Sequence, residues 1–210
     1  MKSIMISIQP KWCAKIESGV KTIEVRKTRP KIETPFKCYI YESKGKTKYW
    51  SQPMPIPYRE GGGKVIGEFV CDRIEEYRTE FYDEEEAYQE IRKVWLDEDY
   101  DYPVEDYRII TTNERENPSD CKLLKNACLT FDEIKKYVGY GDGKFCSLHI
   151  SELKIYDKPK ELGEFRKPCD ADENCYLCEK SGFTPNMQID CFNFLTRPPR
   201  SWSYVEETFR

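Results

Sequence analysis

Apolar and polar residues alternate in several short stretches of this chain, and each stretch predicts a β-strand. In residues 2–9, three isoleucines alternate with Ser3, Met5 and Ser7, and side chains two positions apart lie on one face of a strand. Comparable stretches are residues 22–26, 36–42, 64–71 and 144–156. We therefore expect a sheet whose strands are joined by turns and short helices.

The segment before the second of these strands is predicted to be a short helix. Residues 10–18 begin with Pro10 and place Trp12 and Ile16 four positions apart, and Gly19 follows them. Proline suits the first turn of a helix, and glycine is favoured just past its end. The strand therefore starts directly after a helix that Gly19 closes.

Two further helices are predicted later in the chain. Residues 83–95 have Asp83 as a cap, acidic residues in the first turn and apolar residues at helical spacing. Residues 130–138 have Thr130 as a cap and Glu133 three positions later, which is the pattern of a capping box.

The second strand carries charged as well as apolar side chains. Glu24 and Arg26 fall on one face, and Ile23 and Val25 fall on the other. Lys21 lies just before the strand, where a helix is followed by a strand. Loops at strand ends often carry functional side chains on a rigid scaffold, so this junction is the first candidate site.

The order Gly19, Lys21, Glu24, Arg26, written Gly-x-Lys-x-x-Glu-x-Arg, resembles the signature of the ASCH family, a branch of the PUA-like β-barrels. The resemblance implies an α+β fold, a small mixed β-barrel with short flanking helices. PUA-like domains bind RNA or modified nucleic acid. Some small ASCH proteins resemble amidohydrolases of acylated cytidine, and nuclease activity has been proposed for others. The amidohydrolases have threonine at the position of Glu24, so this chain departs from their pattern.

The sequence predicts one barrel with additions. We expect the ASCH-like barrel over residues 1–160, with residues 77–127 as an acidic helical insertion, and a Cys-rich segment and tail over residues 161–210 that pack on the barrel. A chain of 210 residues is long enough for one core with such additions. The C-terminal segment resembles that of larger phage- or prophage-type ASCH proteins.

Charge is unevenly distributed along the chain. Residues 1–64 contain 14 Lys and Arg against five Glu, although the whole chain has a formal charge of -4. This asymmetry suggests an anionic partner for the N-terminal part; the alternative is that the acidic remainder folds over it. No apolar run is long enough for a membrane helix, and the N-terminus has no signal-peptide pattern. We therefore expect a cytoplasmic protein with no membrane partner.

Glu68 has the same parity as Ile66 and Val70 in its strand, so its carboxylate points where apolar neighbours point. Such a carboxylate must be paired, hydrogen-bonded or shifted in pKa. Two expectations follow. Either Glu68 faces Lys21 or Arg26 at the mouth of the barrel, or it is solvated on a mixed face of the sheet.

Two segments combine basic and aromatic residues, which is the composition of single-stranded nucleic-acid sites. The loop at residues 43–63 contains Trp50 and Arg59, and the tail contains Arg200 and Trp202. These residues could stack on bases and contact phosphates. The alternatives are an ordinary loop anchored by its aromatics and a tail whose aromatic side chains complete the core.

Ten cysteines in a chain without a secretory signal indicate reduced thiols or metal rather than disulfides. Four of them, Cys169, Cys175, Cys178 and Cys191, cluster near the C-terminus. The spacing of Cys175 and Cys178 suits one tetrahedral Zn²⁺, and a structural zinc would order a segment with little apolar material. Unrelated thiols and a redox pair are the other two interpretations.

Three functions are compatible with these residues. In a binding module for RNA, a nucleotide or a modified base, Arg26 would hold a phosphate or base edge, Lys21 would supply charge and Glu24 would accept hydrogen bonds. In an enzyme on nucleotide substrates, an amidohydrolase or a ribonuclease, Lys21 would act as base or nucleophile beside Glu24, Arg26 and Glu68. In a protein-interaction adaptor, the acidic insertion would be the contact surface. The single histidine, His149, is expected to be structural.

Overall fold

The computed structural model describes residues 3–46, 60–81, 89–96, 103–106, 122–139, 143–168 and 193–207. They form a mixed sheet with a few short helices, which confirms the predicted α+β class. The chain divides into two compact units. Unit 1 comprises Met1–Pro10, Lys37–Glu68 and Lys154–Arg210, and unit 2 comprises Lys11–Phe36 and Phe69–Leu153.

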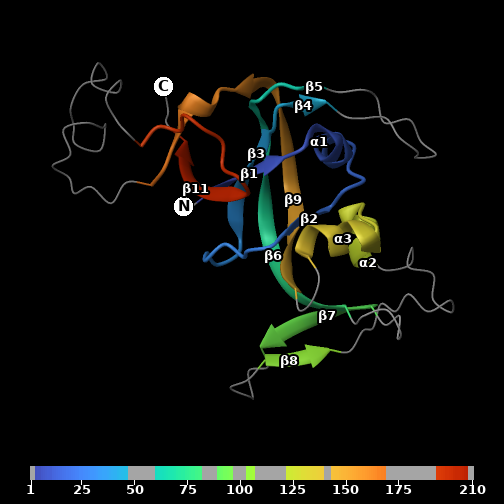
Figure 1. The fold of residues 1–210 in the computed structure, drawn as a ribbon. Helices are drawn as coiled ribbons and strands as arrows, with labels where there is room; N and C mark the ends of the chain where they lie inside the picture. The colour runs from blue at the N-terminus through green and yellow to red at the C-terminus, as the bar shows by residue number, and fades with distance from the viewer. Residues whose placement is uncertain are drawn as a thin grey trace. The chain divides into compact units, whose positions relative to one another are not determined.

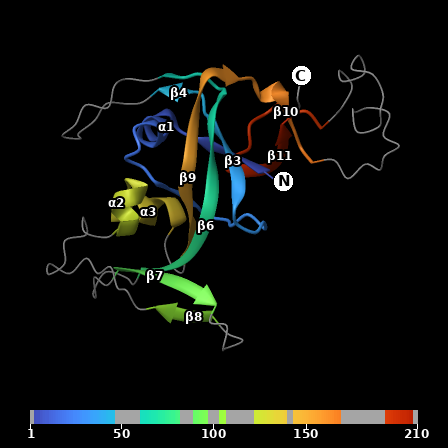
Figure 2. The same ribbon diagram turned by 180° about the vertical axis from the view of Figure 1, so that it is seen from behind.

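Unit 1 is built on strands paired in the order β10-β11-β1-β3-β6 (Figures 1 and 2). Their bounds are β1 Ser3–Ile8, β3 Phe36–Glu42, β6 Val65–Phe81, β10 Phe165–Arg166 and β11 Trp202–Glu207. β1 runs parallel to β3 and antiparallel to β11. Strands from the two ends of the chain are therefore neighbours in one sheet.

The smaller elements of unit 1 are β4 Gly45–Lys46, which pairs with β5 Glu60–Gly61, and the 3-10 helix η2 Leu162–Glu164. β1 is buried almost throughout rather than on one face only. On the side of Met5, the neighbouring strands and β10 contribute a buried apolar cluster that includes Tyr39, Phe165 and Val205.

Unit 2 contains the path β2-β9-β6-β7-β8. The further bounds are β2 Ile23–Arg26, β7 Gln89–Leu96, β8 Pro103–Asp106 and β9 Gly143–Lys160. β2 and β9 are antiparallel, as are β6 and β7. Both paths have unpaired ends, so among the described residues neither unit closes the sheet into the expected barrel.

Three helices belong mainly to unit 2: α1 Pro10–Glu17, α2 Lys122–Ala127 and α3 Phe131–Val138. Figures 1 and 2 show α2 and α3 side by side. α3 has the predicted capping box of Thr130 with Glu133, and Gly139 follows its last turn. The buried core joins α2 and α3 to the sheet through residues that include Ile23, Val25 and Phe145.

The predicted helix over residues 83–95 is wrong where the structure describes it. Gln89–Leu96 is the strand β7, which pairs with the end of β6 on one side and with β8 on the other. Ile91 is buried there with 1% exposure. Partner strands on both sides supply the backbone hydrogen bonds, and β-branched and aromatic residues suit a strand. β6 also continues ten residues beyond the predicted end at residue 71.

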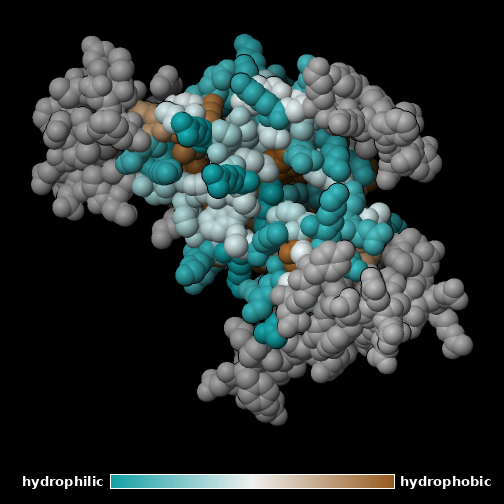
Figure 3. Space-filling view, in the orientation of Figure 1, coloured by the Kyte–Doolittle hydropathy of each residue, from teal (hydrophilic) through white to brown (hydrophobic). Residues whose placement is uncertain are grey.

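On the face seen in Figure 3, the described surface is mostly hydrophilic, with scattered apolar side chains. The large apolar residues exposed there are Val20, Tyr137 and Ile155. Within the described part of the chain, no helix has the length and apolar character needed to span a membrane.

Candidate functional site

The end of α1 fixes the backbone of Lys21. Gly19 has a φ of 72° and its N–H donates to the carbonyl of Ile16 at 2.9 Å. The N–H groups of Val20 and Lys21 both donate to the carbonyl of Lys15, at 3.0 and 2.9 Å. Glycine adopts this left-handed conformation at little cost, so the helix end that the sequence predicts at Gly19 also places Lys21.

The side chain of Lys21 is buried with 2% exposure, and α2 holds it. Its Nζ donates to the carbonyls of Ile23 and Ala127, at 2.7 Å each. Ala127 is the last residue of α2, where carbonyls lack helical partners and carry the negative end of the helix dipole. The N–H of Thr22 also donates to the carbonyl of Asn126, at 2.9 Å. A helix C-terminus therefore receives both the backbone and the ammonium of this segment.

Glu24 bridges two cations. Its Oε2 lies 3.3 Å from Nζ of Lys21, and its Oε1 lies 3.1 Å from Nη2 of Arg26. Glu24 is 5% exposed and Arg26 is 8% exposed. We call Lys21, Glu24 and Arg26 the charged cluster. It carries one more positive than negative charge in a nearly water-free position.

The strand β2 is buried on both faces. Ile23 and Val25 pack into the core with α2 and α3, whereas Glu24 and Arg26 lie in register with Leu148 and Cys146 of β9. The predicted division into an apolar and a charged face is therefore correct, but the charged face is covered as well. Burial, together with the charge of a nearby glutamate, raises the pKa of the Cys146 thiol to about 12, so this thiol is not a nucleophile at neutral pH.

Trp12 of α1 belongs to the same site. Its ring centroid lies 5.3 Å from Nζ of Lys21, 4.1 Å from that of Lys11 and 4.9 Å from that of Lys15. From the sequence, Trp12 was predicted only to be a residue of the first helix. The available signal was the pattern Lys-Trp-x-x-Lys, which sets two lysines beside an aromatic ring on one helix.

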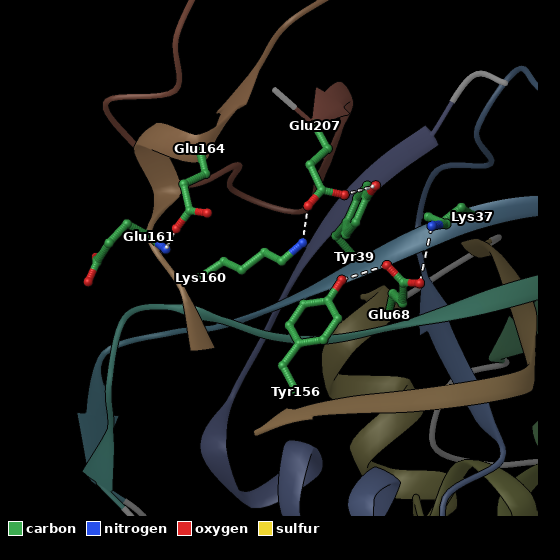
Figure 4. A network of polar contacts seen from close by, with 8 residues as sticks. All are labelled: Lys37, Tyr39, Glu68, Tyr156, Lys160, Glu161, Glu164 and Glu207. Atoms are coloured by element: carbon green, nitrogen blue, oxygen red, sulfur yellow. Dashed lines mark hydrogen bonds and ion pairs between the residues drawn. The ribbon is translucent and has the colours of Figure 1, made fainter. Parts of the chain in front are cut away.

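Glu68 lies in unit 1 and pairs with Lys37 and Tyr156, not with Lys21 or Arg26 as one expectation had it (Figure 4). The Lys37 Nζ is 3.1 Å from Oε1, and the Tyr156 hydroxyl donates to Oε2 at 2.5 Å. Burial alone would raise the pKa of Glu68, but the hydrogen bonds from Tyr156 and Lys37 and the charges of Lys37 and Lys154 outweigh it and lower this pKa. The carboxylate is therefore paired, as its position in the strand required.

Glu207 of β11 has the same kind of partners. It accepts a hydrogen bond from the hydroxyl of Tyr39 at 3.0 Å and pairs with Lys160. Lys160 also lies over the ring of Tyr156, at 4.8 Å. Figure 4 shows these side chains converging from β3, β6, β9 and β11. Burial, with the charge of Glu68, raises the pKa of Tyr39 to about 12, so this hydroxyl stays protonated and ties the strands together.

The remaining predicted site residues are not brought to the charged cluster within one unit. Arg200 is exposed and Trp202 half-buried at the start of β11 in unit 1, where the Trp202 ring meets that of Tyr204 edge-on at 5.4 Å. Trp50, Arg59 and the four clustered cysteines lie outside the described residues.

Metal and histidine sites can be assessed only in the described ranges. There, no group of three or more His, Cys, Asp or Glu side chains is arranged to hold a metal ion. The ring Nδ1 of His149 lies 2.6 Å from a carboxylate oxygen of Asp72. This partly exposed pair is consistent with a structural role for the single histidine.

Comparison with known proteins gives structural similarity alone. No family model matches the chain, and no curated protein matches it. The solved ASCH structure from Zymomonas mobilis is similar with a TM-score of 0.49 and 15% identity, covering 98% of this chain and 88% of that chain. Two mutants of that protein, a Tyr→Phe and a Ser→Ala substitution, each match with a TM-score of 0.49 and 14% identity, covering 91% and 89% of their chains.

Proposed function

We propose that this protein is a nucleic-acid-related, PUA-like module that binds RNA or a nucleotide, including one with a modified base, at the charged cluster. The observation that carries the proposal is the burial of Lys21, Glu24 and Arg26 on and beside one short strand. Taking charges out of water costs several kcal/mol per ion and is often not recovered by pairing. Fold stability does not account for such a cluster, whereas binding of a polar, anionic ligand would.

The three side chains have different parts in this proposal. Arg26 is the most accessible, with 10% of its side chain exposed, and its planar guanidinium suits a phosphate or a base edge. Glu24 would accept a hydrogen bond from an exocyclic amine. Lys21 is held by two carbonyls and Glu24, so it acts as a positioning residue that fixes Glu24 and adds positive charge.

The same contacts favour binding over catalysis by Lys21. The ammonium of Lys21 donates to the carbonyls of Ile23 and Ala127 and forms an ion pair with the carboxylate of Glu24. Attack on a substrate, or abstraction of a proton, would require a neutral amine turned away from all three. Glu68, the other carboxylate considered for catalysis, is paired with Lys37 and Tyr156.

The test is a native gel of a labelled mixed-sequence single-stranded RNA with the wild type and with Arg26→Gln, at low and high salt. We expect a salt-sensitive shift of intact RNA that Arg26→Gln weakens about tenfold or more, because charge-assisted hydrogen bonds are the strong ones. Glu24→Gln should weaken binding as well. Lys136→Gln, which removes the same charge at an exposed position of α3, is the matched control and should bind as the wild type does.

Three results would count against the proposal. Shortened RNA with the wild type and not with Arg26→Gln would favour the ribonuclease interpretation. Equal shifts for wild type and Arg26→Gln would remove the charged cluster from the binding site. If neither RNA nor free nucleotides bind to the wild type, the nucleic-acid function is wrong.

A further inference from the structure

Trp12 lies beside three lysine ammonium groups that are buried to different extents. Lys21 is buried and held by carbonyls. Lys11 is 41% exposed along its side chain and lies 3.7 Å from a carboxylate oxygen of Glu133, a loose contact. The ammonium of Lys15 is 4.9 Å from the ring centroid and has no carboxylate partner among the described residues. Two of the three cations are thus on flexible stems that can leave the ring.

The contact of Lys11 with the ring shows that polar groups can approach Trp12. Its Nζ lies 4.1 Å from the ring centroid, which is the range of a cation–π contact. Trp12 is half-buried, so its ring is fixed by the protein yet not fully covered. Stacking of a nucleobase on an indole contributes more than an exposed cation–π contact does. A base can therefore take the place of a lysine ammonium on this ring.

The surplus charge around Trp12 sets the second requirement for the ligand. Among the described residues, the side chains linked by the contacts given above comprise four cations and two carboxylates: Lys11, Lys15, Lys21, Arg26, Glu24 and Glu133. This leaves an excess of two positive charges. A lysine displaced from the ring stays within reach of the stacked base and gains a partner if the ligand carries a phosphate.

We propose that Trp12 is the stacking surface for one unpaired base and that Lys11 and Lys15 contact the phosphate attached to it. This inference rests on the proposed function. The ligand is then a nucleotide or a single strand. A duplex is excluded, because both faces of its bases are already stacked. A free nucleoside is a weak ligand, because it has no phosphate for the two lysines.

The experiment measures affinity by fluorescence anisotropy of a labelled short oligouridylate with wild type, Trp12→Ala, Trp12→Phe and a Lys11→Gln, Lys15→Gln double variant. We expect about a tenfold loss for Trp12→Ala, since stacking on an aromatic ring contributes roughly this much per base. Trp12→Phe should retain most of the affinity. The lysine double variant should bind more weakly and with a smaller salt dependence, and Lys136→Gln should bind as the wild type does.

A competition experiment on the wild type does not depend on the folding of any variant. Unlabelled single strand and uridine monophosphate should displace the probe, whereas the matching duplex and uridine should do so at least about tenfold less well. Equal competition by duplex or by nucleoside would overturn the inference. If Arg26→Gln weakens binding but Trp12→Ala, folded by circular dichroism, does not, this inference is wrong and the proposed function stands. If the wild type binds neither this probe, nor the mixed-sequence RNA, nor free nucleotides, both are wrong.

Discussion

At the scale of single residues, the charged cluster is costly for the fold, because its ions are buried. Lys21 and Glu24 are nearly inaccessible to water, and their contacts are with backbone carbonyls and with each other. A buried ion pair seldom stabilises a protein more than apolar residues of the same shape do, whereas removing one partner is costly. Replacing Lys21 or Glu24 alone should therefore lower the free energy of unfolding more than replacing both would suggest.

This sensitivity predicts a strong coupling between Lys21 and Glu24. Lys21→Met should lower the free energy of unfolding by about 3 kcal/mol, because it leaves the carbonyl of Ala127 without its donor and Glu24 with one cation fewer. Glu24→Gln should also destabilise, since two buried cations lose their carboxylate. The double variant should lose less than the sum of the two.

Urea unfolding of the four proteins, followed by circular dichroism, measures this cycle. Lys136→Gln on the exposed face of α3 is the control and should be within about 0.5 kcal/mol of the wild type. Additive losses would mean that the 3.3 Å contact between Nζ and Oε2 contributes nothing to folding.

At the scale of elements, the sequence predicted those whose signals are local. The third helix was found with its Thr130 cap and Gly139 end, and residues 36–42 form β3 with the predicted bounds. The predicted helix over residues 83–95 failed because the pairing of β7 with β6 and β8, which is a property of distant segments, overrides local periodicity.

For the candidate site too, only the residues that are close together in the sequence were predicted. The signature fixed Lys21, Glu24 and Arg26, since all lie within one turn and one strand. It could not supply the carbonyl of Ala127, because a backbone group from more than 100 positions away has no signal in side-chain type. Nor could it exclude the pairing of Glu68 with Lys21, because the choice of Lys37 and Tyr156 depends on how three strands are placed.

The pairing of Glu68 links strands in a pH-dependent way. Its pKa is lowered in the folded protein from an ordinary 4.5. A carboxyl group with a lowered folded pKa binds fewer protons when folded, so its contribution to stability is complete above the unfolded pKa and is lost as pH falls through the folded value. We expect the stability advantage of the wild type over Glu68→Gln to shrink as pH falls from neutral to below 4.5.

Unfolding free energies measured across this pH range test the link. Tyr156→Phe should reduce the stability that the carboxylate of Glu68 contributes at neutral pH by about 1 kcal/mol, because it removes the hydroxyl that donates to this carboxylate. Glu33→Gln, at an exposed position, is the matched control for loss of a carboxylate. A difference between wild type and Glu68→Gln that grows towards acid would contradict the lowered pKa.

At the scale of the whole molecule, the first and last described strands, β1 and β11, pair in unit 1. β11 forms an antiparallel pair with β1 over four residue pairs, and Glu207 is held by Tyr39 and Lys160. Within the described part of the C-terminal segment, β10 and β11 are thus strands of the sheet. This placement also brings together the two ends of the segment that carries the clustered cysteines.

The N–H of Lys167 donates to the carbonyl of Asn193 at 2.8 Å, and Cys169 and Cys191 each lie two positions along the chain from this hydrogen bond. The two flanks of the Cys-rich segment are therefore held together without a metal. Cys175 and Cys178, two residues apart, have the spacing typical of half of a zinc site.

We expect protein purified without added metal to contain about one zinc ion per chain by elemental analysis. Cys178→Ser should lose it, while Cys128→Ser, outside the cluster, should retain it. Because thiolate ligands order such segments through the metal, a chelator should open residues 169–191 to a protease in the wild type; zinc far below one equivalent, or equal cleavage with and without chelator, would leave these cysteines as ordinary thiols.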